Sequence, residues 1–384
     1  MILRRVVIRH FDSRSRRGGL GLFSFRCMNL RLLLFAAWLF PLALVTARAE
    51  DSYSFAQGAR GFLIRDYNEK LLAFLQPHFS DRVRIPKQTD EFDAATVDNT
   101  RLLQSSIEGA KAPSGRAGPV EFQAVGLDWP DEFLRCINLI DCWEGTLNKL
   151  EGSSESEDSF PNVTFGIVGF TSHDGSLQEF LREANATTNG AIFQLARDRL
   201  PAAEAARFIG LVETYGSKNQ KRNHEEFVKF AIRNVQADPD EQQPRPEIAA
   251  LFAAFDSIPH FRDIQLAVAR KKSWDGELPE YREQLFGGRQ NHSLRVDLFC
   301  FDMTVLTNGP GEKALHKLSK TPWHDEVERM KQIHAAMKTS PDYKDDEEKR
   351  SDILERERCI IDGVGEVHDD DYDLRAFALL PEKN

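Results

Sequence analysis

The chain has 384 residues with 50 basic and 60 acidic side chains, which gives a net charge of -10 at pH 7. This acidic balance opposes nucleic-acid binding; it suits either a cationic partner or simply a soluble protein. The sequence has no phosphate-binding loop, dinucleotide fingerprint or serine nucleophile elbow, so it does not indicate nucleotide or serine-hydrolase chemistry.

Residues 28–49 have the pattern of a secretory signal peptide: basic Arg31, an apolar run over 32–45, and Ala47-Arg48-Ala49 before the cleavage point. The apolar run is shorter than the roughly 18 residues of a membrane span and contains Pro41. We therefore expect a secreted, extracellular protein with no stable membrane insertion. Residues 1–49 form the targeting region, and Met28 is an alternative start.

Export changes the charge and the cysteine count. Residues 1–49 contain nine arginines and one aspartate, so the remainder has 41 basic and 59 acidic residues and a net charge of -18. Four cysteines remain, Cys136, Cys142, Cys300 and Cys359, which allow one or two disulfides with the pairing open. No cluster has zinc-ligand spacing, so we expect no metal and no cofactor.

Residues 50–118 are expected to form an N-terminal extension with a helix around Tyr67 to Leu75. The extension ends in a linker, GAKAPSGRAGP. The apolar content rises after it, so residues 119–384 are predicted to form the main domain.

Trp129-Pro130-Asp131 can start a helix with an apolar face that ends near Glu144. The helix dipole and apolar neighbours such as Trp143 would both raise the pKa of Glu144, as a general acid needs. A polar loop then supplies Asp158. One carboxylate in an apolar setting and another on a wetter loop are typical of a glycosidase. The alternative is that Glu144 is an exposed acid at a helix end.

Apolar spacing predicts three further helices, over 177–184 with Ser176 as N-cap, over 248–255 and over 327–337. The best strand is 163–170, so the class is mainly α, or α+β with a small sheet. In the apolar run 298–306, Asp302 needs a partner, for which Arg350 and Arg329 are candidates. The acidic segment 369–373 is expected to be a solvated terminus.

Several segments resemble the glycoside hydrolase family 46 chitosanases of the lysozyme-like superfamily. They are GIVGFTSHDGSL at 166–177, FDMTVLTNGPG at 301–311, Asp325-Glu326, AAM at 335–337 and Arg350-Ser351-Asp352. The resemblance extends from Phe133 to Leu374.

The resemblance implies a two-lobed lysozyme-like/chitosanase fold with a cleft between the lobes. It implies a monomeric, endo-acting enzyme that cleaves β-1,4 linkages in chitosan or a similar amino-sugar polymer with inversion. Glu144 matches the general acid, Asp158 the general base and Thr164 the threonine that holds the water. Asp302 and Arg350 match an ion-pair network that supports the acid.

Three departures from the family pattern keep alternatives open. The loop SESEDSFPN leaves Glu155 and Glu157 as other candidates for the base. Ser176 stands where chitosanases have an aspartate that contacts the amine, and Ile333 replaces a second network arginine. The alternatives are therefore a peptidoglycan-acting hydrolase of the same superfamily and a catalytically inactive glycan-binding descendant.

Overall fold

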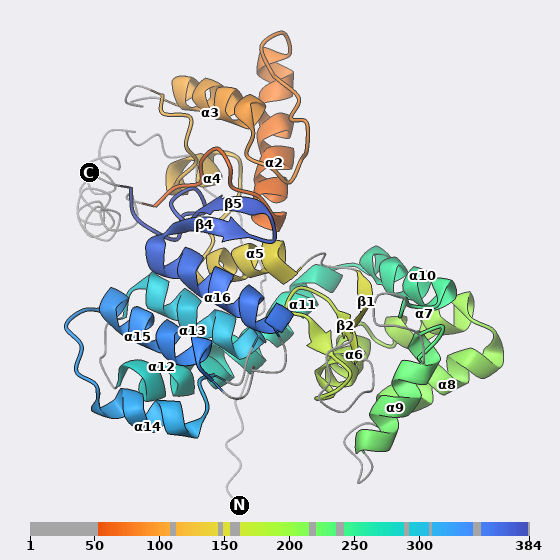
Figure 1. The fold of residues 1–384 in the computed structure, drawn as a ribbon. Coiled ribbons are helices and arrows are strands. Elements are labelled where there is room, and N and C mark those ends of the chain that lie inside the picture. The colour runs from red at the N-terminus through yellow and green to blue at the C-terminus, as the bar shows by residue number, and fades with distance from the viewer. Residues whose placement is uncertain are drawn as a thin grey trace, which may run out of the picture. The chain divides into compact units, whose positions relative to one another are not determined.

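The computed structural model describes residues 53–107, 113–144, 149–153, 162–214, 220–235, 242–287, 292–306, 309–340 and 347–382, all within the unit Asp51–Asn384. The expected targeting region and the base candidates Asp158, Glu155 and Glu157 lie outside the described residues. The described chain is mainly helical with two small antiparallel sheets (Figure 1), which confirms the expected class.

The helices follow the apolar periodicity of the sequence. Those of the first half are α2 (Phe62–Phe79), α3 (Ala94–Ser106), α4 (Pro119–Ala124), α5 (Glu132–Glu144), α6 (Ser176–Thr187), α7 (Ala191–Arg199), α8 (Ala202–Glu213) and α9 (Gln220–Ala231). Those of the second half are α10 (Pro246–Ala254), α11 (Phe261–Ala269), α12 (Leu278–Phe286), α13 (Leu294–Leu306), α14 (Glu312–Lys320), α15 (Glu326–Lys338) and α16 (Glu347–Asp362).

The first sheet has the order β1-β2-β3, formed by β1 (Leu150–Ser153), β2 (Asn162–Phe165) and β3 (Phe170–Thr171). The expected strand over 163–170 is thus two short strands joined by a turn at 166–169. Gly166 and Gly169 in this turn have φ angles of 87° and 58°, a conformation that favours glycine. The glycines therefore reverse the chain where we expected it to continue.

The second sheet is a hairpin of β4 (Val364–Val367) and β5 (Asp370–Asp373), which packs on α16. The prediction that residues 369–373 form a solvated terminus is wrong, because four of them pair with β4. Tyr372 is buried and packs on Phe377, and it anchors a strand whose acidic side chains are exposed.

Residues 53–107 pack against the rest of the unit through buried contacts. Asn138 of α5 accepts a hydrogen bond from Leu63 N at 2.9 Å and donates one to Arg60 O at 2.8 Å. Arg262 of α11 forms two bonds to Asp66 of α2, at 2.9 and 2.6 Å. The expected helix around Tyr67 to Leu75 is confirmed as part of α2.

Two helix starts differ from expectation. The N-cap of α6 is Gly175, with φ 82°, whereas Ser176 is the first helical residue and its hydroxyl accepts a bond from Thr171 N. Helix α5 begins at Glu132 rather than at Pro130, and Asp131 accepts the bond from Leu134 N at 2.9 Å. Its C-terminal end at Glu144 is as predicted.

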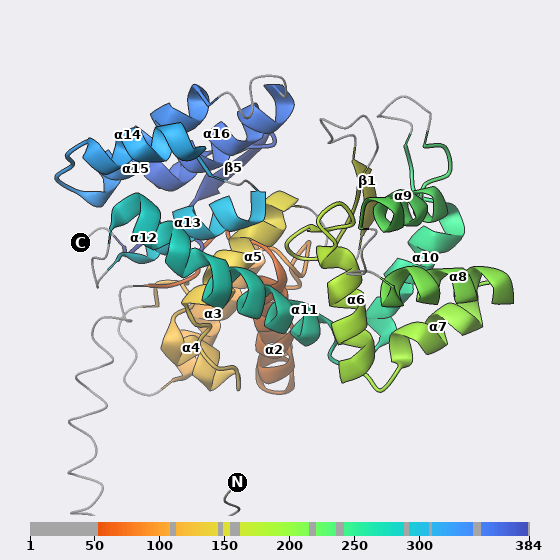
Figure 2. The same ribbon diagram turned by 90° about the horizontal axis from the view of Figure 1, so that it is seen from below.

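The path from α11 to α12 is continuous in Figure 2 because a π-helical segment, η3 (Arg270–Glu277), joins them. The wider turn places Trp274 against Phe133 of α5 and Phe301 of α13, with ring centroids 5.6 and 5.2 Å apart. This packing holds α5 and α13 together, and these helices carry Glu144 and Asp302.

In the part of the chain that the structure describes, no helix has the length and apolar character of a membrane span. Cys136, Cys142, Cys300 and Cys359 are all free thiols. The disulfides that the cysteine count allowed are therefore not formed in this structure.

Candidate functional site

Arg356 of α16 is the centre of a buried ion cluster formed by three helices. Both of its terminal nitrogens donate to Oε1 of Glu144 at 2.6 Å. Its Nε and one terminal nitrogen donate to Oδ1 of Asp302 at 3.1 and 2.9 Å. Asp352, one turn earlier on α16, lies 3.5 Å from the same guanidinium. The side chain of Arg356 is only 1% exposed, and it lies over the ring of Trp143.

The cluster has three carboxylates for one guanidinium, so it has a net charge of -2 when all three are ionised. Burial raises the pKa of Asp302 to about 7, against the lowering effect of Arg356, and the charges of Asp352 and Glu144 add to the rise. Burial lowers the pKa of Arg356, but the charges of the carboxylates outweigh this effect, so its pKa is raised. Asp302 is therefore the carboxyl of this cluster whose pKa is raised into the neutral range.

The expected partner of Asp302 was wrong. Arg350 forms its ion pair with Glu347, and Arg329 donates to the carbonyl oxygens of Leu285 and Leu318. Arg350 precedes Arg356 by six residues, a rotation of roughly 240° around the helix, so it lies on another face of α16.

Glu144 is the last residue of α5 and the member of the cluster that meets the glycine turn of the first sheet. Its side chain is 19% exposed, whereas that of Asp302 is 5% exposed. A β-carbon at Gly169 would lie 3.2 Å from Oε2 of Glu144. Glycine at this position therefore lets the turn approach the carboxylate. Arg356 favours the charged form of Glu144, which opposes the effect of the apolar neighbours. The proton affinity of Glu144 therefore depends on the whole cluster.

Gln265 of α11 supports the glycine turn, and sequence reasoning did not find it. Its side chain is fully buried, and Oε1 accepts a hydrogen bond from Ile167 N at 3.1 Å. A β-carbon at Gly166 would lie 2.5 Å from the same oxygen. The turn is thus fixed from one side by Gln265 and meets Glu144 on the other.

Thr164 of β2 belongs to a polar row that crosses the first sheet. It pairs with Glu151 on β1 and Thr171 on β3, and all three are partly exposed. The next row, formed by Leu150, Phe165 and Phe170, is buried. Glu151 is therefore a carboxylate beside the expected water-holding threonine, and it was missed because it precedes the acidic loop.

Asp141 lies one turn before Glu144 and is 7% exposed, and its Oδ1 has no hydrogen-bond partner. Burial raises its pKa to about 8, the charge of Glu144 adds to the rise, and Arg65 and Arg262 oppose it. A second neutral carboxyl therefore lies near the cluster at neutral pH.

Three acids in or just before α6, Asp174, Glu179 and Glu183, have cationic partners on this chain. Asp174 lies 3.3 Å from Lys272, and Glu183 lies 3.3 Å from Lys271. Glu179 pairs more loosely with Arg182, at 4.0 Å. This pairing neutralises charge that a cationic polymer would otherwise meet.

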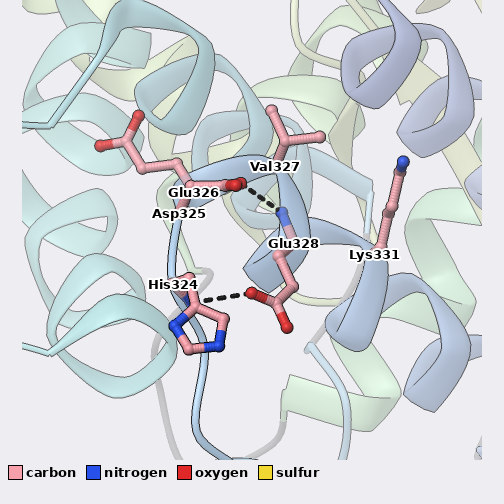
Figure 3. A pocket seen from close by; sticks show the side chains of 6 residues that line it. All are labelled: His324, Asp325, Glu326, Val327, Glu328 and Lys331. Carbon is pink, nitrogen blue, oxygen red and sulfur yellow. Dashed lines mark hydrogen bonds between the residues drawn. The ribbon is translucent and has the colours of Figure 1, made fainter.

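A surface hollow lined by six residues lies at the N-terminal end of α15, and it contains none of the cluster residues (Figure 3). Asp325 caps α15 by accepting from Glu328 N at 2.8 Å, and Glu328 accepts from His324 N at 2.8 Å. Asp325 therefore has a capping role. The described residues contain no group of three or more acidic, histidine or cysteine side chains that could hold a metal ion.

The comparisons with protein families, curated proteins and solved structures found no match to this chain.

Proposed function

We propose that the protein is a secreted, endo-acting glycoside hydrolase, similar to the family 46 chitosanases, with a two-lobed lysozyme-like fold. Its substrate class is a β-1,4-linked amino-sugar polymer, and its reaction is hydrolysis with inversion. The observation that carries the proposal is the buried cluster of Glu144, Arg356, Asp302 and Asp352, in which Glu144 is the partly exposed end and burial raises the pKa of Asp302 to about 7.

In this mechanism, Glu144 donates its proton to the glycosidic oxygen as the bond to the anomeric carbon breaks. A base removes a proton from a water molecule, whose oxygen attacks the anomeric carbon from the opposite face. Glu144 is ionised after this step, and Arg356 stabilises the carboxylate that forms. Asp302 orients Arg356 from the buried side.

The assay is release of reducing ends from soluble chitosan. Glu144→Gln removes the transferable proton and should lower the rate by at least about 100-fold. The control is Glu213→Gln, since Glu213 is also the last residue of a helix and is exposed. Full activity of Glu144→Gln would disprove its role as the acid.

The same assay separates the base candidates. We expect Asp158→Asn to abolish turnover and Glu151→Gln to retain it. The reverse result would move the role of base to the polar row beside Thr164. If neither variant loses activity, Glu155 and Glu157 remain to be substituted.

The pairing of Asp174 and Glu183 with lysines favours a second polymer, peptidoglycan, because fewer free acids are left to bind amines. Assays of chitosan and bacterial cell walls side by side distinguish the two substrates. Binding of chitosan oligomers without turnover of either polymer would instead identify a catalytically inactive glycan-binding protein.

A further inference from the structure

The β4–β5 hairpin places a histidine on the ion cluster. His368 Nε2 lies 2.8 Å from Oδ1 of Asp352, whose other oxygen faces Arg356 at 3.5 Å. The side chains of His368, Asp352 and Arg356 are 49%, 21% and 1% exposed. This sequence of contacts leads from solvent to the buried guanidinium and on to Glu144.

The backbone at His368 makes this residue an unexpected choice for the turn. His368 and Asp369 are the two residues between the paired strands, and their φ angles are 53° and 65°. A two-residue turn with positive φ at both positions favours Asn-Gly or Asp-Gly. Positive φ is uncommon for a residue other than glycine, so the side chain of His368 merits a functional explanation.

We propose that His368 is a positioning residue, which orients Asp352 and, through Arg356, adjusts the proton affinity of Glu144. The protonated ring brings a positive charge to a cluster that is otherwise negative. That charge opposes the binding of a proton by the three carboxylates. The role of His368 in catalysis rests on the proposed hydrolase function. The chain of contacts from His368 to Glu144 through Asp352 and Arg356 is independent of that function.

Other charged groups also face the hairpin turn. Asp352 and Arg356 face it from α16, and the hairpin itself contributes Glu366 and the exposed acids at 369–371. Arg60 pairs with Asp370 at 3.1 Å and lies over the ring of Tyr372. Of these groups, Asp352 both pairs with His368 and contacts Arg356. We therefore assign the coupling between His368 and Glu144 to the path through Asp352 and Arg356.

The test substitution is His368→Asn, because asparagine tolerates positive φ and keeps the turn while removing the titratable ring. His260→Asn is a matched control. His260 is exposed, has φ 61° and lies 2.9 Å from Asp263. The chitosan pH–rate profile should change in His368→Asn only, because this substitution removes the contact that orients Asp352 beside Arg356. An unchanged profile would overturn the role of His368 in catalysis.

A reciprocal measurement needs no substrate. Coupling between two sites acts equally in both directions, so a change at Glu144 must alter the titration of the His368 ring. In Glu144→Gln the NMR signal of this ring should move at a lower pH than in the unaltered protein, because the cluster has lost a negative charge. Glu213→Gln should leave it unchanged.

The two measurements separate the two proposals. If chitosan and cell walls are not hydrolysed but the ring titration responds to Glu144→Gln, the hydrolase proposal fails and the link between His368 and Glu144 stands. If hydrolysis occurs and the ring titration does not respond, the link is overturned and the hydrolase proposal stands.

Discussion

Asp141 shows at the scale of one residue how a buried carboxyl affects stability. It precedes Glu144 by one helical turn, and its pKa is raised to about 8, first by burial and then by the charge of Glu144. An unfolded aspartate releases its proton near pH 3.8, so only the folded state retains the proton between these values. Stability therefore falls as pH rises through this window, and the loss is complete above pH 8.

Asp141→Asn removes this proton linkage while preserving the shape of the neutral side chain. We expect the variant to match the unaltered protein near pH 4 and to be more stable at pH 8.5, by roughly 3 to 5 kcal/mol. Urea unfolding at both pH values provides the measurement. The control is Asp256→Asn, at an exposed aspartate. A variant less stable at pH 8.5 would show that Asp141 is ionised and paired in the folded state.

The sequence identified Glu144 and Asp302 but not the arginine between them. An acid at the end of an apolar helix and an acid within an apolar run both stand out from their neighbours. Helix α16 contains three arginines, Arg350, Arg356 and Arg358, and its composition does not show which face is buried. The spacing of Asp352 and Arg356, four residues apart, was a usable signal because such pairs lie on one face.

At the scale of an element, the turn between β2 and β3 lies close to the carboxylate of Glu144. Gly169 has φ 58°, and a β-carbon there would lie 3.2 Å from Oε2 of Glu144. In Gly169→Ala the methyl group would strain the backbone and would also displace the carboxylate of Glu144. We expect a loss of about 1 kcal/mol in stability and a fall in chitosan hydrolysis of at least about tenfold.

Gly287→Ala separates these two effects. Gly287 has a similar φ of 69°, but a β-carbon there would meet no atom within 4 Å. It should therefore show the loss of stability without the loss of activity, as measured by thermal unfolding and the reducing-end assay. Equal activities in the two variants would contradict the proposed contact between the turn and Glu144.

The elements that sequence reasoning missed are those whose form depends on distant partners. The strand over 163–170 was interrupted by its own glycines, and Gln265, almost 100 residues later in the chain, fixes the resulting turn. Residues 369–373 have the composition of a solvated end, yet they pair with β4 and pack on α16. The π-helical turn at 270–277 follows from the packing of Trp274, which no local pattern encodes.

At the scale of the molecule, the mainly helical class followed from the apolar spacing, because long amphipathic helices depend on local periodicity. Cysteine count was a weaker guide, since a count allows disulfides without placing any two thiols together. Three of the four described cysteines are fully buried, and Cys142 is partly buried. Stability of the described unit therefore comes from its packed core, without help from cross-links.

These thiols should stay reduced even if the protein is exported. Burial raises the pKa of Cys359 to about 12 and also raises the pKa values of Cys136, Cys142 and Cys300, so few reactive thiolates exist at neutral pH. We expect the melting temperature of the chain lacking residues 1–49 to change by less than about 1 °C with dithiothreitol, since no loop-closing bond is lost. A thiol reagent should then detect four groups in the denatured protein and few in the native one. A marked fall in melting temperature on reduction would reveal a disulfide and contradict the free state of these cysteines.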